Sequence, residues 1–172
     1  MHVKREALRM TDAEVDSYIA ANQFGRLASV NPEGEPHVTP IGYVDWNGAI
    51  YFLSMRRSRR SRDLASNPKV SMCIDDGVSA GEDYTQRRGV VLYGRCVLAD
   101  EDESTLEIVR ARFADRQGLR ADESARTTHD WYRVDVDRRV SWDFRRIPPG
   151  ADFKADRIRG ATSDRPSEPA NG

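Results

Sequence analysis

Residues 89–99, with the sequence GVVLYGRCVLA, give the strongest strand signal in the chain. Most of them are β-branched, aromatic or otherwise apolar, which is typical of a strand that packs into a core. Residues 69–75 have the same character and follow an Asn-Pro pair, which should end a short helix at residues 61–66. Residues 103–116 place apolar side chains at helical spacing behind an acidic first turn. We therefore expect helix, strand, strand and helix in succession.

Two turn signals divide the preceding segment. The sequence NPEG at residues 31–34 suits a type I turn, and NG at residues 47–48 suits a two-residue hairpin turn. These turns separate three predicted strands, at about residues 24–30, 37–45 and 49–54. Pro40 has no N–H to donate to a neighbouring strand, so it marks a sheet edge or a bulge.

The outer segments complete this pattern. Thr11 and Glu14 form a capping box that predicts a helix over residues 12–21. Residues 132–144 alternate apolar with charged side chains and predict a sixth strand, with a break expected at Arg138-Arg139. Hairpin-connected strands with few helices favour a small antiparallel barrel, because closing a sheet removes its edges.

The domain organisation follows from composition. Residues 1–147 fit one mainly β (α+β) domain, since domains commonly contain about 100–200 residues. Residues 148–172 are too poor in apolar side chains to offset the entropy cost of ordering them. We expect a disordered polar tail there.

Charge and hydropathy exclude several classes of protein. The 27 basic and 28 acidic residues nearly cancel, so no overall field draws the chain to nucleic acid or anionic lipid. No apolar run approaches the ~20 residues that a membrane-spanning helix needs, and the N-terminus has no signal-peptide features. We expect a cytoplasmic protein. The three histidines are scattered, without the spacing of a metal site.

The segment SMRRSRRSR at residues 54–62 carries five arginines within seven residues. It lies between a predicted strand end and a helix start. Ser58 is placed to cap that helix, so backbone N–H groups and the positive end of the helix dipole would point toward the same place. Arginine binds phosphate with two hydrogen bonds, each contributing about 1.5–3 kcal/mol. A phosphate monoester or diester therefore fits. A solvated face or an RNA-contacting patch stays open as an alternative, disfavoured by the balanced charge and missing aromatic platform.

This segment, continued through Leu64 to Asn67-Pro68, resembles the Ser-Arg-Lys…Leu…Asn-Pro segment of the pyridoxamine 5′-phosphate oxidase-like superfamily. The likeness covers about residues 11–147, including an RGV strand opening at residues 88–90 and a closing SWDFR at residues 141–145. It implies a six-stranded antiparallel split β-barrel with a few short flanking helices, working as a homodimer with cofactor sites at the interface.

The resemblance also implies the cofactor-binding residues. The phosphate contacts would come from Ser54, Ser58, Arg59 and Arg60, where Arg60 stands in place of the family's usual lysine. Val38, Thr39 and Pro40 would approach the cofactor ring from the first long strand, and Gly89 of the RGV opening belongs to the same set. Trp142 and Arg145 would close the pocket from the second subunit. No catalytic side chain is assigned.

The superfamily includes enzymes that use flavin mononucleotide (FMN), enzymes that use the deazaflavin coenzyme F420, and haem-binding branches. In its length, its RGV strand opening at residues 88–90 and its SWDFR ending at residues 141–145, the chain resembles the short F420-dependent reductases most. The expected activity is hydride transfer from reduced F420 to a small conjugated acceptor, with Arg56 and Arg57 available to the acidic tail of F420. An FMN-dependent oxidoreductase of the same fold is the alternative. A non-catalytic flavin- or haem-binding protein, or an RNA-contacting protein, is the alternative of another class.

Overall fold

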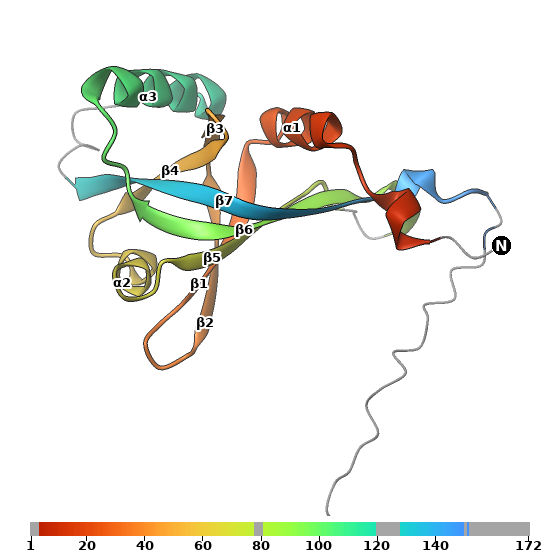
Figure 1. Cartoon of the computed structure of the whole chain (residues 1–172), viewed down its shortest axis with the longest axis horizontal. Helices are drawn as coiled ribbons and strands as arrows, with labels where there is room; N and C mark the ends of the chain where they lie inside the picture. Colours follow the sequence, from red (N-terminus) through yellow and green to blue (C-terminus); the bar gives the residue numbers. More distant parts are fainter. Residues whose placement is uncertain (1–3, 78–80, 120–127, 150, 152–172) are drawn as a thin grey trace, which may run out of the picture.

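The computed structural model describes residues 4–77, 81–119, 128–149 and 151. Within residues 1–147 the described part forms one sheet with helices packed against it (Figure 1). The expected disordered tail falls almost entirely outside the described residues and stays a prediction.

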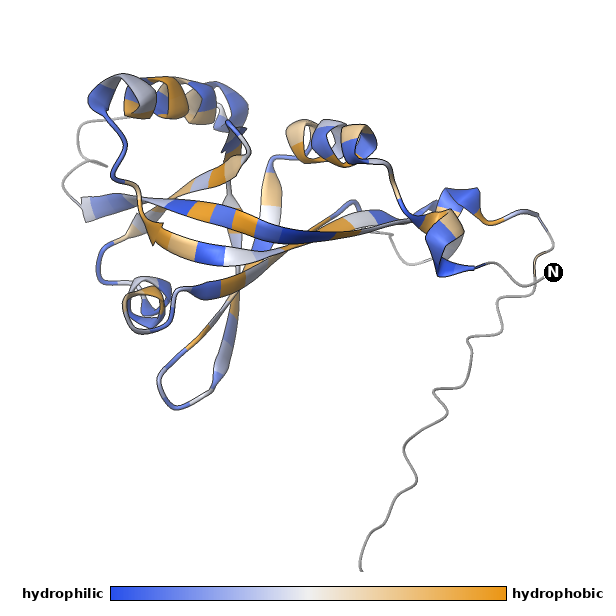
Figure 2. Cartoon of the chain, viewed as in Figure 1, coloured by the Kyte–Doolittle hydropathy of each residue, from blue (hydrophilic) through white to orange (hydrophobic). Residues whose placement is uncertain are grey.

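Seven strands form a single antiparallel sheet in the order β2-β1-β5-β6-β7-β4-β3. The strands are β1 (Phe24–Val30), β2 (Pro36–Gly42), β3 (Val44–Trp46), β4 (Ala49–Met55), β5 (Lys69–Asp75), β6 (Arg88–Leu98) and β7 (His129–Asp143). The sheet curves into a half-barrel, which agrees with the split-barrel prediction. Figure 2 shows hydrophilic and hydrophobic residues alternating along β6 and β7, as expected when one face of a strand is buried.

The predicted count of six strands is wrong by one. The run expected at residues 37–45 divides at Tyr43, because β2 pairs with β1 whereas β3 pairs with β4. Tyr43 is fully buried and its hydroxyl donates to the carbonyl of Ile19 at 2.8 Å. The chain therefore changes partner strands at a residue that is anchored in the core.

The break expected at Arg138-Arg139 is also wrong. β7 runs without interruption, and a bulge takes up the irregularity: Tyr93 pairs with Arg138 while Gly94 pairs with Val136. A Cβ atom on Gly94 would lie 2.0 Å from the carbonyl oxygen of Asp135, so the close approach of the two strands requires glycine.

Three α-helices flank the sheet: α1 (Asp12–Ala21), α2 (Arg59–Ser66) and α3 (Glu103–Gln117). The predicted capping box is present, since the Thr11 side chain accepts from the backbone N–H of Glu14 and the Glu14 side chain accepts from that of Thr11. α1 and α3 lie on one side of the β6–β7 pair, and α2 lies on the other (Figure 1). Short 3-10 helices occur at Arg5–Leu8, Tyr84–Gln86 and Phe144–Arg146.

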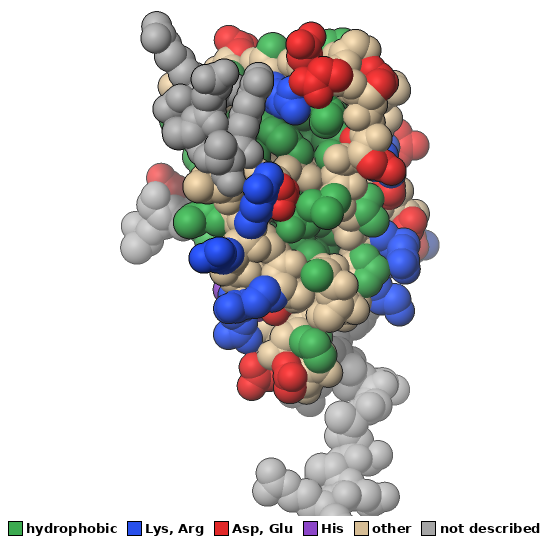
Figure 3. Space-filling view, turned by 90° about the vertical axis from the view of Figure 1, so that its left-hand side faces the viewer, with side chains coloured by type: hydrophobic (Ala, Val, Ile, Leu, Met, Phe, Trp, Pro, Cys, Tyr) green, Lys and Arg blue, Asp and Glu red, His purple; other side chains and the backbone are tan. Residues whose placement is uncertain are grey.

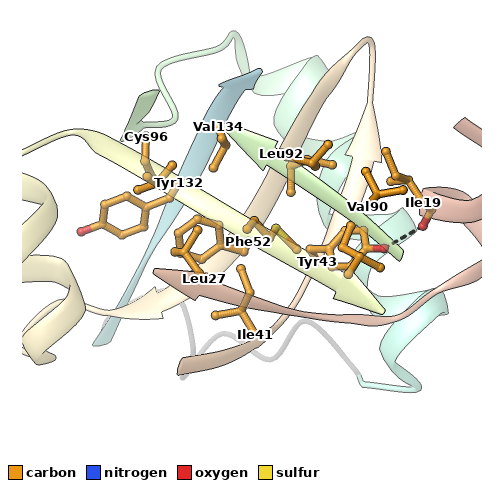
Figure 4. Packing of buried hydrophobic residues seen from close by; sticks show 14 of the residues in the cluster. Ile19, Leu27, Ile41, Tyr43, Phe52, Val90, Leu92, Cys96, Tyr132 and Val134 are labelled. Carbon is orange, nitrogen blue, oxygen red and sulfur yellow. Dashed lines mark hydrogen bonds between the residues drawn. The ribbon is translucent and has the colours of Figure 1, made fainter. Parts of the chain in front are cut away.

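The main core lies inside the curved sheet and beneath α1 (Figure 4). Phe52 of β4 stacks on Tyr132 of β7, with ring centroids 5.4 Å apart and planes 11° from parallel. Packing of this kind fixes the end of β4, after which the arginine-rich segment begins. Among the described residues, no helix has the length and apolar character needed to cross a membrane.

Candidate functional site

The arginine-rich segment forms the connection from β4 to α2. Ser58 caps α2, as predicted, and its hydroxyl accepts from the backbone N–H of Ser61 at 3.1 Å. α2 begins at Arg59, two residues earlier than predicted, because this cap lies at Ser58. The first N–H groups of the helix point out of its N-terminus, where an anion is favoured.

Arg60 is the central side chain of this connection. Its guanidinium donates to the Ser54 hydroxyl at 2.9 and 3.2 Å and to the Thr39 hydroxyl at 2.7 Å. It also lies 5.5 Å from the centre of the Phe52 ring. No carboxylate among the described residues lies within ion-pair distance of it. Burial lowers the pKa of Arg60, because the charged form loses its water.

Such an arrangement indicates a binding site for an anion. A partly buried charge without a counter-charge is costly, and the cost is removed when an oppositely charged ligand arrives. Hydroxyl groups hold the guanidinium in place without cancelling its charge. Arg60 is therefore oriented by its own chain and left available to a phosphate.

Three serine hydroxyls lie together beside Arg60. The Ser54 oxygen is 3.2 Å from that of Ser58 and 3.1 Å from that of Ser61, and the Ser58 hydroxyl donates to Ser61 at 3.0 Å. Ser61 also donates to the carbonyl of Met55, which ties α2 to the end of β4. Each hydroxyl can both donate and accept, so the group can redirect a hydrogen bond toward a ligand.

The other arginines of the segment differ from Arg60. Arg56 donates to Asp130 at 2.7 Å and Arg59 to Glu35 at 3.3 Å. Both are exposed, as are Arg57 and Arg62. Figure 3 views the molecule from the side of α2 and the start of β7, where basic side chains gather beside a central area of hydrophobic ones.

The predicted residues of β2 divide between two faces. Thr39 points inward and contacts Arg60, whereas Val38 and Pro40 are exposed on the opposite face. β2 is an edge strand of the sheet, in agreement with the expectation for Pro40. The structure thus brings Thr39 to the arginine segment but not Val38 or Pro40.

Gly89, Trp142 and Arg145 lie at the other end of the molecule. Met55, next to the arginine segment, pairs with His129 at the start of β7, whereas Gly89 pairs with Trp142 near its end. His129 and Trp142 are thirteen positions apart on β7, which corresponds to roughly 40 Å along an extended strand. Within one chain these three residues therefore do not join the site around Arg60.

Contacts within the chain account for the positions of Gly89, Trp142 and Arg145. The Trp142 ring covers Gly89, where a Cβ atom would lie only 2.1 Å from the ring. Arg145 donates to both carboxylate oxygens of Asp143, at 2.8 and 2.7 Å, and this contact lowers the pKa of Asp143. A cleft of about 490 Å³ lies here, and its lining includes Tyr18 of α1 together with Arg145.

Sequence reasoning missed Phe52, Ser61 and Asp63. Phe52 was assigned only to a strand, although it supports the guanidinium of Arg60. Ser61 stands three residues after the cap, a spacing that places it on the same side of the helix. Asp63 of α2 is buried and accepts from the Ser29 hydroxyl at 3.0 Å. It is the single acidic residue between Met55 and Ser66, a signal that could have marked it.

Comparison with known proteins agrees with this fold. Residues 11–143 match the family described as pyridoxamine 5′-phosphate oxidase. A 5a,11a-dehydrotetracycline/5a,11a-dehydrooxytetracycline reductase from Streptomyces rimosus is 34% identical over 82 residues, which cover 45% of this chain and 56% of the relative. The match thus spans little more than half the length of that relative.

Solved structures show the same architecture. A conserved hypothetical protein, Rv2991, from Mycobacterium tuberculosis superimposes with a TM-score of 0.71 at 25% identity, over 90% of this chain and 98% of the other. The haem storage protein HutZ from Vibrio cholerae gives a TM-score of 0.62 at 17% identity, over 76% of this chain and 94% of the other. The chain belongs to the pyridoxamine 5′-phosphate oxidase family.

Proposed function

We propose that the protein is a homodimeric reductase that binds coenzyme F420 and passes hydride from its reduced form to a small conjugated acceptor. The observation that carries the proposal is Arg60, a partly buried guanidinium held by hydroxyls and without a carboxylate partner among the described residues. The reductase relative from Streptomyces rimosus supports the oxidoreductase assignment.

The residues present fit a cofactor with a ribityl phosphate. Arg60 would bind the phosphate with its charge, while the Ser58 hydroxyl and the N–H groups at the start of α2 would supply further donors. The bound deazaflavin supplies the hydride chemistry. The chain holds the phosphate, orients the ring by that anchor and excludes water from the contact, which are the usual contributions of a protein to cofactor chemistry.

Two features support a homodimer. The first is the separation between Arg60 and the pair Trp142 and Arg145, which a second chain can remove by bringing its own far end to the arginine segment. Since the family places such residues in the partner subunit, the site is incomplete without a second copy.

The second feature is the outer face of the sheet, on which apolar side chains outnumber the two arginines, Arg26 and Arg138. Cross-strand pairing places two rows of residues on it, Val38-Ala28-Ser71-Tyr93-Arg138 and Pro40-Arg26-Cys73-Val91-Val140. Val38, Tyr93 and Val140 are 58%, 37% and 38% exposed. A copy packed on this face would bury them and would give Val38 and Pro40 access to a ring bound between the subunits.

FMN is the alternative cofactor, and proteins of this family typically bind flavins. The phosphate site alone does not separate the two, but F420 carries a longer acidic tail. Exposed Arg57 and the neighbouring Arg56 are placed to meet it. Reversing both charges should weaken F420 binding about tenfold or more while FMN, which has no such tail, changes much less. Unchanged F420 affinity together with tighter FMN binding would contradict the preference for F420.

The direct test is a fluorescence titration of the purified protein with F420 and, separately, with FMN, with Arg59→Ala/Arg60→Ala in parallel. Binding of one cofactor that collapses in the double variant supports the proposal. Consumption of reduced F420 with conjugated acceptors, followed by absorbance, then tests turnover. If neither cofactor binds below the high-micromolar range, the proposal fails.

The alternative of another class is a non-catalytic flavin- or haem-binding role, and HutZ shows that this fold serves a haem storage protein. A Soret band in the purified protein, or saturable haem binding without turnover of reduced F420, would favour it.

A further inference from the structure

Three polar contacts join β2 to α2, and together we call them the β2–α2 seam. They are Glu35 with Arg59 at 3.3 Å, His37 with Asp63 at 3.6 Å and Thr39 with Arg60 at 2.7 Å. His37 and Thr39 are two positions apart and so lie on one face of β2, and Glu35 directly precedes the strand. The seam therefore contributes to the position of α2, together with the contact between Ser61 and Met55, and so to the position of Arg60 relative to Thr39.

The middle contact of the seam is the buried one. The Asp63 side chain is only 5% exposed, and its Oδ2 accepts from the Ser29 hydroxyl at 3.0 Å. The Nδ1 atom of His37 faces the same oxygen and is buried without a hydrogen-bond partner among the described residues. A buried carboxylate with one hydroxyl donor is poorly compensated, so a positive charge on His37 would complete this contact.

The surroundings leave Asp63 as the partner of His37. From α2, Asp63 faces the ring, with Arg59 and Arg60 at the neighbouring contacts of the seam. From β1, the residue opposite His37 is the uncharged Ser29. Glu35, which directly precedes β2, accepts a hydrogen bond from Arg59.

We propose that His37 and Asp63 are a positioning pair, which holds α2 against β2 when His37 is protonated and thereby strengthens binding of the cofactor phosphate at Arg60. Two effects act in the same direction. Protonated His37 shortens the contact that locates α2, and it neutralises the Asp63 carboxylate, whose negative charge otherwise opposes that of the bound phosphate. Anion binding should thus be tighter at a pH at which His37 is protonated than at a pH at which it is neutral.

The inference rests on the proposed phosphate site, and its test uses the full-length protein with His37→Gln. Glutamine keeps a hydrogen-bonding group near Asp63 but takes no charge. F420 and FMN affinities are measured at pH 5.5 and 8.0 for wild type and variant. Each ligand is compared between the two proteins at the same pH, so ionisation of the FMN phosphate cancels. His129→Gln is the matched control, since the His129 ring contacts a hydroxyl, that of Thr128, at 2.8 Å.

At pH 5.5 we expect His37→Gln to bind the cofactor about fivefold more weakly than wild type, which corresponds to about 1 kcal/mol. At pH 8.0 the two should agree within about twofold, and His129→Gln should follow wild type at both pH values. Equal pH dependence in wild type and His37→Gln would overturn the inference.

A ligand-free experiment separates this inference from the cofactor assignment. Urea unfolding of wild type, His37→Gln, Asp63→Asn and the double variant gives the coupling free energy between the two side chains. Asp63→Asn keeps an acceptor for Ser29, so the fold should be retained. Coupling at pH 5.5 that disappears at pH 8.0 supports the pair even if neither cofactor binds. Absence of coupling at both pH values rejects it.

Discussion

An arginine lies near each end of β7, Arg60 of α2 near its start and Arg145 just after its end. Each is next to a buried polar group, but the two charges are compensated differently. Arg145 at the far end donates twice to Asp143, whose side chain is 8% exposed. Arg60, near the start of β7, donates to the hydroxyls of Ser54 and Thr39 and lies beside the Phe52 ring, with no carboxylate partner among the described residues. A charge balanced within the chain serves the fold, whereas a charge that is oriented but not balanced is available to a ligand.

The comparison also distinguishes contacts that form within one chain from contacts that need a second copy. At the far end, Trp142 and Arg145 are explained by contacts within the chain, with Gly89 and Asp143. Their proposed cofactor role therefore depends on a second copy. At the near end the contacts that orient Arg60 for the proposed anion site are formed within one chain.

Arg60→Ala tests the near end and should have the largest effect. We expect about a hundredfold loss of cofactor affinity, since one or two charge-assisted hydrogen bonds to phosphate are removed. Stability should not fall and could rise, because an uncompensated charge leaves a partly buried position. Titration and urea unfolding of the same preparation measure both quantities. A large loss of stability with little loss of affinity would show that Arg60 has a structural role instead.

Gly89→Ala tests the packing at the far end. The added methyl group would meet the Trp142 ring, so the free energy of unfolding should fall by about 1–3 kcal/mol. The same substitution in a Trp142→Ala background should cost much less, because the obstructing ring is gone. Equal costs in both backgrounds, measured by urea unfolding, would mean that Trp142 does not require glycine at this position.

Arg145→Ala tests the compensated charge and its pH dependence. Arg145 lowers the pKa of Asp143 below the ordinary value of 3.8, so the contact stabilises the fold at pH values above about 4. That contribution should be lost as pH falls through the lowered pKa of Asp143. Wild type should exceed the variant by only about 1 kcal/mol at pH 7, because Arg145 is 45% exposed and Arg146 still faces Asp143 at 3.8 Å. The difference should shrink below pH 4. A difference that stays constant down to pH 2.5 would argue against the ion pair.

Thr39→Val should have the smallest effect of this series. Valine has the same shape but removes the hydroxyl that accepts from the Arg60 guanidinium. Cofactor affinity should fall about threefold, as expected for one neutral acceptor that orients a charged donor. Thr39→Ser, which keeps the hydroxyl, is the matched control and should bind the cofactor as wild type does. Equal effects of the two substitutions would contradict the proposed role of the Thr39 hydroxyl.

Much of the fold could be predicted from local signals. The capping box at Thr11 and the hydrophobic run of residues 69–75 gave the bounds of α1 and β5 as the structure has them. The division at Tyr43 and the bulge opposite Tyr93 could not be predicted, because both arise when a strand changes or adjusts its partner. Strand pairing is a long-range property that residue alternation does not report.

The site was predictable to a similar degree. Crowded arginines behind Ser58 indicated an anion site, but only the three-dimensional contacts single out Arg60 among five arginines. The contact between His37 and Asp63 joins residues 26 positions apart, and no local pattern marks it. Local sequence thus locates the arginine-rich connection from β4 to α2, whereas the packing of the sheet determines which of its side chains face inward.

The central claim is that the Arg60 site binds the phosphate of the cofactor. Its most direct test compares FMN with riboflavin, which differ in that group alone, and F420 with its deazaflavin precursor, which lacks both the phosphate and the acidic tail. We predict that the wild-type protein binds the phosphorylated member of the effective pair about a hundredfold more tightly, and that Arg60→Ala removes most of this difference. Equal affinity of the wild-type protein for both members of each pair would contradict the account.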